Sequence, residues 1–327
     1  MSKPLVVESY EVEVDFGGGA GIFDQTYSVP EGTILGMIGP SGCGKTTTMR
    51  VALGLLAPQK GRISTFGKVP TSFRASDRER IGYIPQQFVL YPRLTVSENA
   101  AFVASLYGMT GPQIKPRLAE LLDFVELSEA KDRLGQNLSG GMQRRLMLVS
   151  ALMHDPALLF ADEPTAGIDP VLRARFWDFF RKLRDEGRTL YVSTQYVGEA
   201  IYCDYVAVMR KGRILAIDTP LGLRKSVLGG DVIHLTLKEP DQLRAALDRL
   251  KRFAPVQAAQ RVPGSDDQIH ATVDDAGEWL PEVLNFLEKN VAMPIMVSSA
   301  EELQISYDDI FIKLMQQEEA KQEAAGE

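Results

Sequence analysis

The chain has 327 residues, of which 45% are hydrophobic and 24% are charged, a composition typical of a globular protein long enough for two domains. Residues 1–230 carry a net charge of +3, whereas residues 231–327 carry a net charge of −10. The acidic C-terminal part argues against nucleic acid as a direct partner, and no apolar run is long enough to span a membrane.

The cysteines and the N-terminus indicate the compartment. Cys43 and Cys203 show no paired spacing, which is typical of a protein of the reducing cytosol. The first ten residues, MSKPLVVESY, lack the apolar core of a signal peptide. We therefore expect a soluble, cytoplasmic protein that could dock on a membrane partner.

The first two thirds of the chain alternate strands and helices. Alternating or continuous apolar residues predict strands over 5–16, 23–29 and 33–38, followed by a helix over 47–56. Further along we expect strands over 62–66, 81–85, 157–161 and 189–194, helices over 95–109, 114–125, 142–153 and 170–186, and a hairpin over 205–209 and 213–217. This alternation, with some strands apolar throughout, favours an α/β core with parallel strands.

The order of elements changes beyond a boundary near residues 228–230. We expect strands over 232–237, 256–261, 268–273 and 294–297, helices over 241–253 and 278–289, and an acidic helix from 308 to the end. The order βαββαβ is that of a small α+β, ferredoxin-like domain. Its pairs Asp266-Asp267 and Asp274-Asp275 flank a strand, where solvated turns are a better interpretation than a metal site.

A phosphate-binding loop lies between the third strand and the first helix. The pattern G-x-x-x-x-G-K-[ST] is met by Gly39, Pro40, Ser41, Gly42, Cys43, Gly44, Lys45 and Thr46, and Thr47 follows. The glycines let the backbone N–H groups turn toward phosphate oxygens, which the positive end of the helix also attracts. We expect Lys45 to reach the β- and γ-phosphates and the Thr46 hydroxyl to bind Mg²⁺.

Two carboxylates follow the apolar strand over 157–161. Because ligands gather at the carboxyl ends of parallel strands, Asp162 is a candidate to hold Mg²⁺. Glu163 is a candidate to orient and deprotonate a water molecule. A charged strand end that faces solvent is the alternative, but the phosphate loop favours hydrolysis.

Several motifs together resemble a known family. Gly39–Thr46, Gln86, Leu138-Ser-Gly-Gly-Met142, Leu158–Glu163 and Ala166-Gly-Ile-Asp169 stand in the order found in ATP-binding subunits of ABC transporters. The resemblance covers residues 5 to about 228. It implies an ABC ATPase domain over 1–228, with an antiparallel strand subdomain and a helical subdomain over about 88–155. Residues 231–327 would then form an accessory, regulatory or dimerisation domain.

The resemblance also assigns roles to residues. Phe16 matches the aromatic residue that stacks on adenine, with a core Phe at the strand end as the alternative. Gln86, or Gln87 beside it, matches the residue that touches Mg²⁺ or the attacking water. The signature residues Ser139, Gly140 and Gly141 match the group that binds the γ-phosphate of the opposite protomer, and Ser139 is a natural helix N-cap.

Asp169 matches the loop that crosses the interface of the two protomers. Two ATP molecules would therefore lie between two head-to-tail subunits, and hydrolysis would require dimerisation.

Two positions depart from the family pattern. Met142 stands where Gln is usual, which we expect to be tolerated. Gln195 stands where a switch histidine is expected, and an amide can donate a hydrogen bond to a phosphate oxygen but cannot relay a proton. His154, His234 and His270 do not fit the switch position and show no metal spacing. We therefore expect Glu163 to do the proton work, with Gln195 positioning.

The resemblance implies the cytoplasmic ATPase subunit of a transporter. The sequence Thr194-Gln195-Tyr196 and the closing segment Ser306–Phe311 are similar to those of daunorubicin-resistance-like exporters of the ABC-2 class. ATP and Mg²⁺ would be its ligands, and a second ATP-binding subunit and separate transmembrane permease subunits its partners. The alternatives are a ribosome- or chromosome-associated ABC ATPase and a slow nucleotide-dependent regulator.

Overall fold

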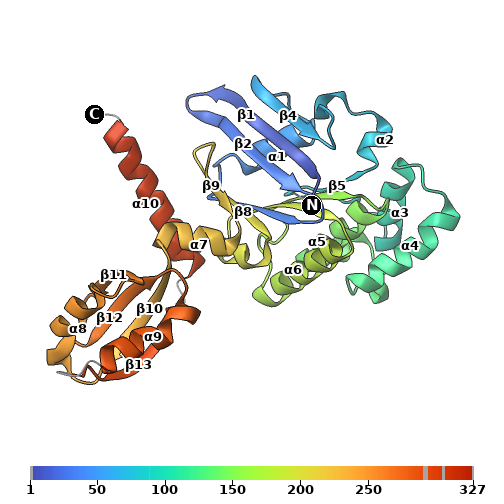
Figure 1. Cartoon of the computed structure of the whole chain (residues 1–327). Helices are drawn as coiled ribbons and strands as arrows, with labels where there is room; N and C mark the ends of the chain where they lie inside the picture. The colour runs from blue at the N-terminus through green and yellow to red at the C-terminus, as the bar shows by residue number, and fades with distance from the viewer. Residues whose placement is uncertain (1–2, 88, 290–293, 304–305, 326–327) are drawn as a thin grey trace. The chain divides into compact units, whose positions relative to one another are not determined.

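The computed structural model describes residues 3–87, 89–289, 294–303 and 306–325. The chain divides into two compact units, Met1–Thr219 and Pro220–Glu327, which are traced in Figure 1. The division falls earlier than the boundary expected near 228–230, because helix α7 (Pro220–Leu228) packs against α10 and β10 of the second unit.

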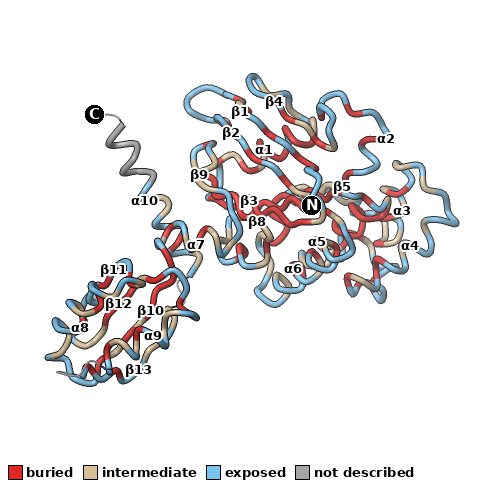
Figure 2. The backbone as a smooth tube through the Cα atoms, in the orientation of Figure 1, coloured by how far each residue is buried: buried red, intermediate tan, exposed pale blue. Residues whose placement is uncertain are grey.

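A six-stranded sheet forms the centre of the first unit. Its order is β5-β6-β7-β3-β8-β9, with every pair parallel except β8 and β9. The strands are β3 (Ile34–Ile38), β5 (Ile81–Ile84), β6 (Leu158–Asp162), β7 (Thr189–Thr194), β8 (Tyr205–Arg210) and β9 (Arg213–Asp218). All residues of β3, β6 and β7 are buried, as the apolar run over 157–161 predicted for β6, and Figure 2 shows the tube at the centre of this unit in the colour of buried residues.

A three-stranded antiparallel sheet packs against helix α1, which also contacts the six-stranded sheet. The order of the antiparallel sheet is β2-β1-β4, from β1 (Leu5–Gly17), β2 (Ala20–Pro30) and β4 (Lys60–Thr65). Helix α1 (Lys45–Ala52) contacts β2, β4 and β6. The expected helix over 47–56 was therefore too long. Gly54 turns the chain with φ +71°, and a Cβ there would lie 2.2 Å from the Pro70 carbonyl oxygen.

Helices gather at the β5 edge of the six-stranded sheet (Figure 1). They are α2 (Ala75–Arg78), which the sequence did not predict, α3 (Val96–Leu106), α4 (Gly111–Phe124) and α5 (Gly140–Leu152). The predicted capping box is present, since the side chains and backbone N–H groups of Thr95 and Glu98 bond reciprocally. Helix α4 begins at the expected Gly111-Pro112 break, because Pro is well tolerated in a first turn. Helix α6 (Pro170–Asp185) packs against β7 and β3.

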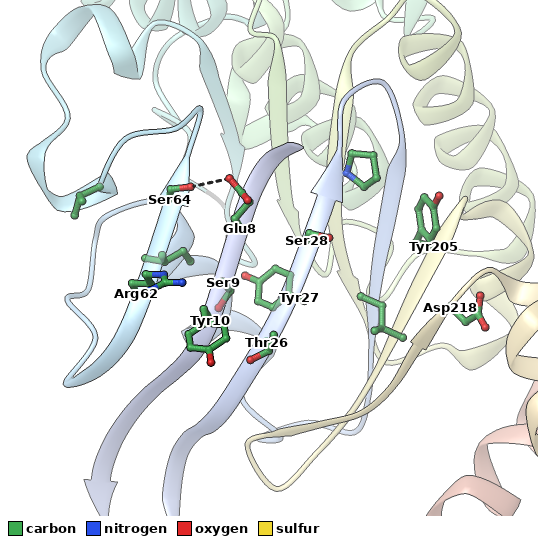
Figure 3. Close-up of a pocket in the computed structure, with 14 residues that line it drawn as sticks. Glu8, Ser9, Tyr10, Thr26, Tyr27, Ser28, Arg62, Ser64, Tyr205 and Asp218 are labelled. Carbon is green, nitrogen blue, oxygen red and sulfur yellow. Dashed lines mark hydrogen bonds between the residues drawn. The ribbon is translucent and has the colours of Figure 1, made fainter. Parts of the chain in front are cut away.

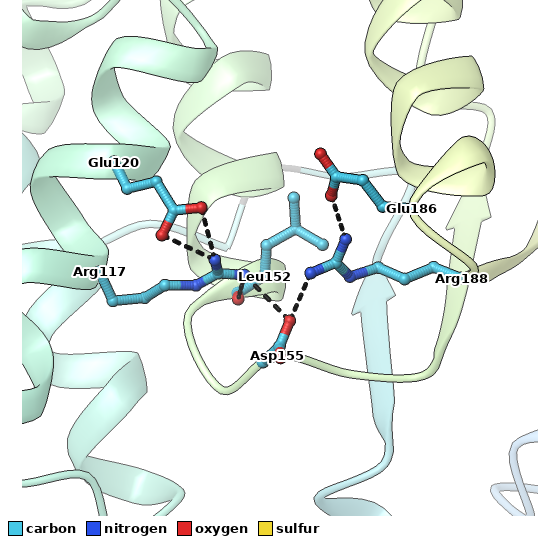
Figure 4. Close-up of polar contacts among 6 residues, drawn as sticks. All are labelled: Arg117, Glu120, Leu152, Asp155, Glu186 and Arg188. Carbon is cyan, nitrogen blue, oxygen red and sulfur yellow. Dashed lines mark hydrogen bonds and ion pairs between the residues drawn. The ribbon is translucent and has the colours of Figure 1, made fainter.

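An ion-pair network joins α4 to the sheet (Figure 4). The Asp155 carboxylate, just after α5, accepts hydrogen bonds from Arg117 of α4 at 3.1 Å and from Arg188, which precedes β7. Arg117 also bonds Glu120, and Arg188 bonds Glu186. Both arginine side chains are more than four-fifths buried, and these carboxylates, together with the Leu152 carbonyl oxygen for Arg117, supply polar partners for their charges.

The second unit is a four-stranded antiparallel sheet with helices on one face. Its order is β11-β12-β10-β13, from β10 (Asp231–Leu237), β11 (Val256–Arg261), β12 (Gln268–Val273) and β13 (Val297–Glu302). Helices α8 (Leu243–Leu250) and α9 (Ala276–Glu288) close one apolar core, and α10 spans Tyr307–Ala325. The strand expected over 294–297 begins only at Val297. No helix in the described ranges has the length and apolar character needed to cross a membrane.

We predict that Asp155→Asn lowers the free energy of unfolding by about 1 kcal/mol at neutral pH, a small value because this carboxylate is mostly exposed. Burial alone would raise the pKa of Asp155, but the hydrogen bond from Arg188 and the charges of Arg188 and Arg117 hold it below its ordinary value. Its contribution is therefore present above that ordinary pKa and lost on acidification. Denaturant unfolding should show the difference from wild type shrinking steadily as the pH falls below about 4, and a difference that stays constant there would contradict this assignment.

Candidate functional site

The phosphate loop connects β3 to α1, and its glycines allow the backbone conformation that it adopts. Gly42 and Gly44 adopt positive φ of 77° and 108°, which a side chain would disfavour. At Gly44 a Cβ would also lie 2.9 Å from Ile22. Burial, opposed by the charge of Lys45, raises the pKa of the Cys43 thiol. Cys43 therefore contributes its backbone and a neutral side chain to the loop.

The Asp162 carboxylate connects three parts of the site. It ends β6, is 1% exposed, and accepts hydrogen bonds at Oδ1 from Thr46 Oγ1 at 3.1 Å and from Ser193 Oγ at 2.6 Å. The Ser193 hydroxyl on β7 also accepts the Glu163 backbone N–H at 3.0 Å. Thr46 and Asp162 thus present a hydroxyl and a carboxylate at one point, which is the oxygen donor set that Mg²⁺ prefers.

The Glu163 side chain has partners on both sides. Lys45 Nζ lies 3.2 Å from Glu163 Oε1 and donates to the carbonyl oxygens of Gly39 and Pro40. Gln86 Nε2 donates to Glu163 Oε2 at 3.0 Å. Glu163 also has a positive φ of 48°, which is unusual for a residue with a side chain and turns the chain sharply after β6.

One cavity of about 240 Å³ gathers nine of the site residues proposed from the sequence. Its lining comprises Phe16, Ala20, Gly21, Ser41, Gly42, Gly44, Lys45, Thr46, Thr47, Gln86 and Glu163. Phe16 is 60% exposed, so its interpretation as a core residue at the strand end is wrong. Gln86 rather than Gln87 lines this cavity.

Gln195 lies at the edge of the loop. Its Oε1 accepts a hydrogen bond from Ser41 Oγ at 3.0 Å. Gln195 directly follows β7, so this strand places an amide beside the loop at the position where the resemblance predicts a histidine.

The signature residues do not line the cavity of their own chain. Ser139 caps α5 by accepting the Met142 backbone N–H at 3.3 Å, as predicted. A Cβ on Gly141 would lie 2.4 Å from Leu172, whereas a Cβ on Gly140 would meet nothing within 4 Å. Asp169 caps α6 by accepting the backbone N–H groups of Val171 and Leu172, each at 3.0 Å.

Two residues of the site were missed from the sequence. Ser193 on β7 bonds both Asp162 and the backbone of Glu163. This could not be predicted because it depends on the pairing of β6 with β7. Arg144 on α5 donates to the Gln86 carbonyl oxygen at 3.0 Å and to that of Ala166 at 3.3 Å. Its place shortly after the signature is a signal that could have identified it. Arg144 connects the signature helix to both segments that flank Glu163.

A larger cavity, of about 750 Å³, lies elsewhere (Figure 3). It runs along the antiparallel sheet, where Arg62 lies over the Tyr10 ring at 4.7 Å, and it reaches Tyr205 and Asp218. None of the residues proposed from the sequence lines it. Size alone would therefore misplace the site, whereas the convergence of a phosphate loop, a lysine and paired carboxylates locates it.

Comparisons with known proteins agree with this geometry. Residues 23–166 match the family described as ABC transporter. The Nod factor export ATP-binding protein I of Burkholderia orbicola (strain AU 1054) is 37% identical over 249 residues, which is 76% of this chain and 81% of that protein. The linearmycin resistance ATP-binding protein LnrL of Bacillus subtilis (strain 168) is 38% identical over 214 residues, covering 65% and 68% of the two chains.

Solved structures show the same cassette. The dimeric bacterial ABC transporter cassette MJ0796 superimposes with a TM-score of 0.60 at 26% identity, covering 65% of this chain and 98% of that one. Its dimeric post-hydrolysis state bound to ADP and Pi gives a TM-score of 0.59 at 25% identity over the same shares.

We predict that Ser193→Ala weakens nucleotide binding in the presence of Mg²⁺ by about tenfold, because it leaves a buried carboxylate with one fewer donor. Binding without Mg²⁺ should change much less. Ser150→Ala is the matched control, since the buried Ser150 hydroxyl has no hydrogen-bond partner among the residues that the structure describes. Fluorescent-nucleotide titration with and without Mg²⁺ would test this. Equal losses in both conditions would mean that Ser193 only supports the fold.

Proposed function

This chain belongs to the ABC transporter family, and we propose that it powers export through a separate membrane permease of the ABC-2 class. It is an ATPase that binds ATP with Mg²⁺. The relatives named for Nod factor export and for linearmycin resistance support export. The cargo belongs to the permease, so it does not follow from this chain.

The observation that carries the catalytic proposal is the cavity in which Lys45, Thr46, Gln86 and Glu163 converge. The loop N–H groups and Lys45 would hold the phosphates, and the exposed Phe16 ring would stack on the adenine. Thr46, Asp162 and Gln86 would hold Mg²⁺, which neutralises developing charge on the phosphates when bound.

Glu163 would accept the proton of the attacking water. In the structure its carboxylate pairs with the Lys45 ammonium, and the same ammonium is required by a bound γ-phosphate. Binding of the phosphate would therefore draw Lys45 away from Glu163 and free the carboxylate to act as a base. Gln86 would keep that carboxylate oriented through its hydrogen bond to Oε2.

The active unit is proposed to be a dimer of two such chains. Family members work with a membrane permease and dimerise, as the cassette MJ0796 does. Gly140 has open space around its Cα, so packing within the chain does not require a glycine there. A partner's γ-phosphate, approaching the N-terminus of α5 closely, would require one.

The second unit is proposed to be a ferredoxin-like accessory or dimerisation domain. The sheet order β11-β12-β10-β13, with all pairs antiparallel, supports it. The segment Ser306–Phe311, which is similar to the closing segment of that exporter subgroup, begins helix α10. Ser306 Oγ accepts the Asp309 backbone N–H at 3.2 Å at the start of α10, and Ile310 is buried.

We predict that Glu163→Gln binds MgATP but loses turnover about a hundredfold or more, because the amide cannot accept the proton. A phosphate-release assay beside nucleotide binding measures both. Normal turnover would remove Glu163 as the base.

Tagged Glu163→Gln protein, purified from native membranes with MgATP, should carry a polytopic membrane protein in equal amount. Recovery of ribosomes or chromosome-associated proteins instead would favour an ABC ATPase outside transport.

We predict that the turnover of wild type shows no ionisation of a histidine near pH 6.5, because Gln195 does not titrate. Gln195→His should introduce one, measured as the pH profile of kcat at saturating MgATP. The positioning role of Gln195 would be contradicted if the kcat profile of wild type already showed an ionisation near pH 6.5 and if His154→Gln kept it.

A further inference from the structure

Two histidines come together on the sheet of the second unit. His234 on β10 and His270 on β12 are direct partners in the antiparallel register. His234 Nδ1 and His270 Nε2 are 3.1 Å apart, and the ring planes are inclined at 61°. The two residues are 36 positions apart in the sequence, so a search for local metal-ligand spacing could not find them.

The pair lies on the open face of the sheet. Ile233 and Leu235, which flank His234, and Ile269, which precedes His270, are fully buried in the core that α8 and α9 close. Because side chains alternate between the faces of a strand, both imidazoles project to the opposite face. Each histidine is only partly buried, so the pair is not enclosed in the core.

The neighbouring strands extend the pair into a row of four polar side chains. Glu301 on β13 is the direct partner of His234, and Gln260 on β11 is the direct partner of His270. Burial, together with the charges of His234 and Lys313, lowers the pKa of His270. A metal ion binds the neutral form of an imidazole ring.

We propose that this histidine pair binds one divalent transition-metal ion through His234 Nδ1 and His270 Nε2. Two imidazole nitrogens that each lie about 2.0–2.1 Å from one tetrahedral ion are themselves about 3.3 Å apart, which is close to the 3.1 Å separation here. Imidazole favours Zn²⁺, Cu²⁺ and Ni²⁺ over Mg²⁺ or Ca²⁺. The ion is thus distinct in class from the magnesium of the ATP site.

The remaining coordination positions belong to water, with the Glu301 carboxylate supplying negative charge nearby. Within the described ranges, no three or more His, Cys, Asp and Glu side chains are arranged to hold a metal ion. The site therefore has two protein ligands, and it binds less tightly than a three- or four-ligand site. Without the ion, one ring donates an N–H to the other. Binding requires that ring to carry its proton on its other nitrogen.

The test is a calorimetric titration of Zn²⁺ into the full chain, purified without a polyhistidine tag and freed of metal by chelation. Wild type should bind one Zn²⁺ per chain and unfold at a higher temperature with it. His270→Gln keeps a hydrogen-bonding partner for His234 but removes a ligand, so its affinity should fall by about tenfold or more. His154→Gln, which changes the remaining histidine of the chain, should bind Zn²⁺ as wild type does.

A variant that gains Zn²⁺ affinity is also needed, because a loss of affinity in His270→Gln could come from misfolding. Gln260→His places a third imidazole beside His270 in the same row, and it should raise the affinity by about tenfold or more. The proposal is overturned if wild type binds no Zn²⁺ up to millimolar concentration. It is equally overturned if His270→Gln binds as wild type does, if His154→Gln loses the site, or if Gln260→His gives no gain.

Discussion

Two adjacent carboxylates, those of Asp162 and Glu163, are buried at the end of β6, and the geometry of the site depends on how they are satisfied. Burying an unpaired charge costs several kcal/mol, so each carboxylate must be met by donors. Thr46 and Ser193 meet Asp162, and Lys45 and Gln86 meet Glu163. These donors come from the phosphate loop, from β7 and from the segment after β5. The requirement to satisfy two charges therefore brings three separate segments to one place.

This pairing also explains why the site can exchange partners. Every donor that serves a carboxylate here is itself suited to phosphate or to Mg²⁺. In the proposed function, a nucleotide with its metal ion would therefore replace the internal bonds without leaving a buried charge alone. Arg144 adds a mechanical connection, because it holds the carbonyl oxygens of Gln86 and Ala166 from the signature helix. A displacement of α5 would thus move the segments that contain Gln86 and Ala166, which lie on either side of Glu163.

The sequence predicted the elements of the first unit well, because their signals are local. Apolar runs identify β3, β6 and β7, and glycines, capping residues and the phosphate loop fix the boundaries around them. The errors arose where tertiary contacts decide. Helix α1 ends at Ala52, shortly before Gly54 turns the chain against the Pro70 carbonyl oxygen, and packing on α10 assigns α7 to the second unit. Ser193 and the pair His234–His270 depend on strand order and register, which local spacing does not contain.

The arrangement of Lys45 suggests why hydrolysis by a lone subunit would be slow. In the structure its ammonium is held by two loop carbonyls and by Glu163, so the residue proposed as the base and the cation proposed to bind phosphate neutralise each other. Phosphate binding would separate them, but a freed carboxylate still needs a water molecule in line with the γ-phosphate. The residues proposed to close over that phosphate, Ser139 and Gly140, lie outside this cavity. Release of the base by one chain and closure by the second would then be two separate conditions, and turnover would require both.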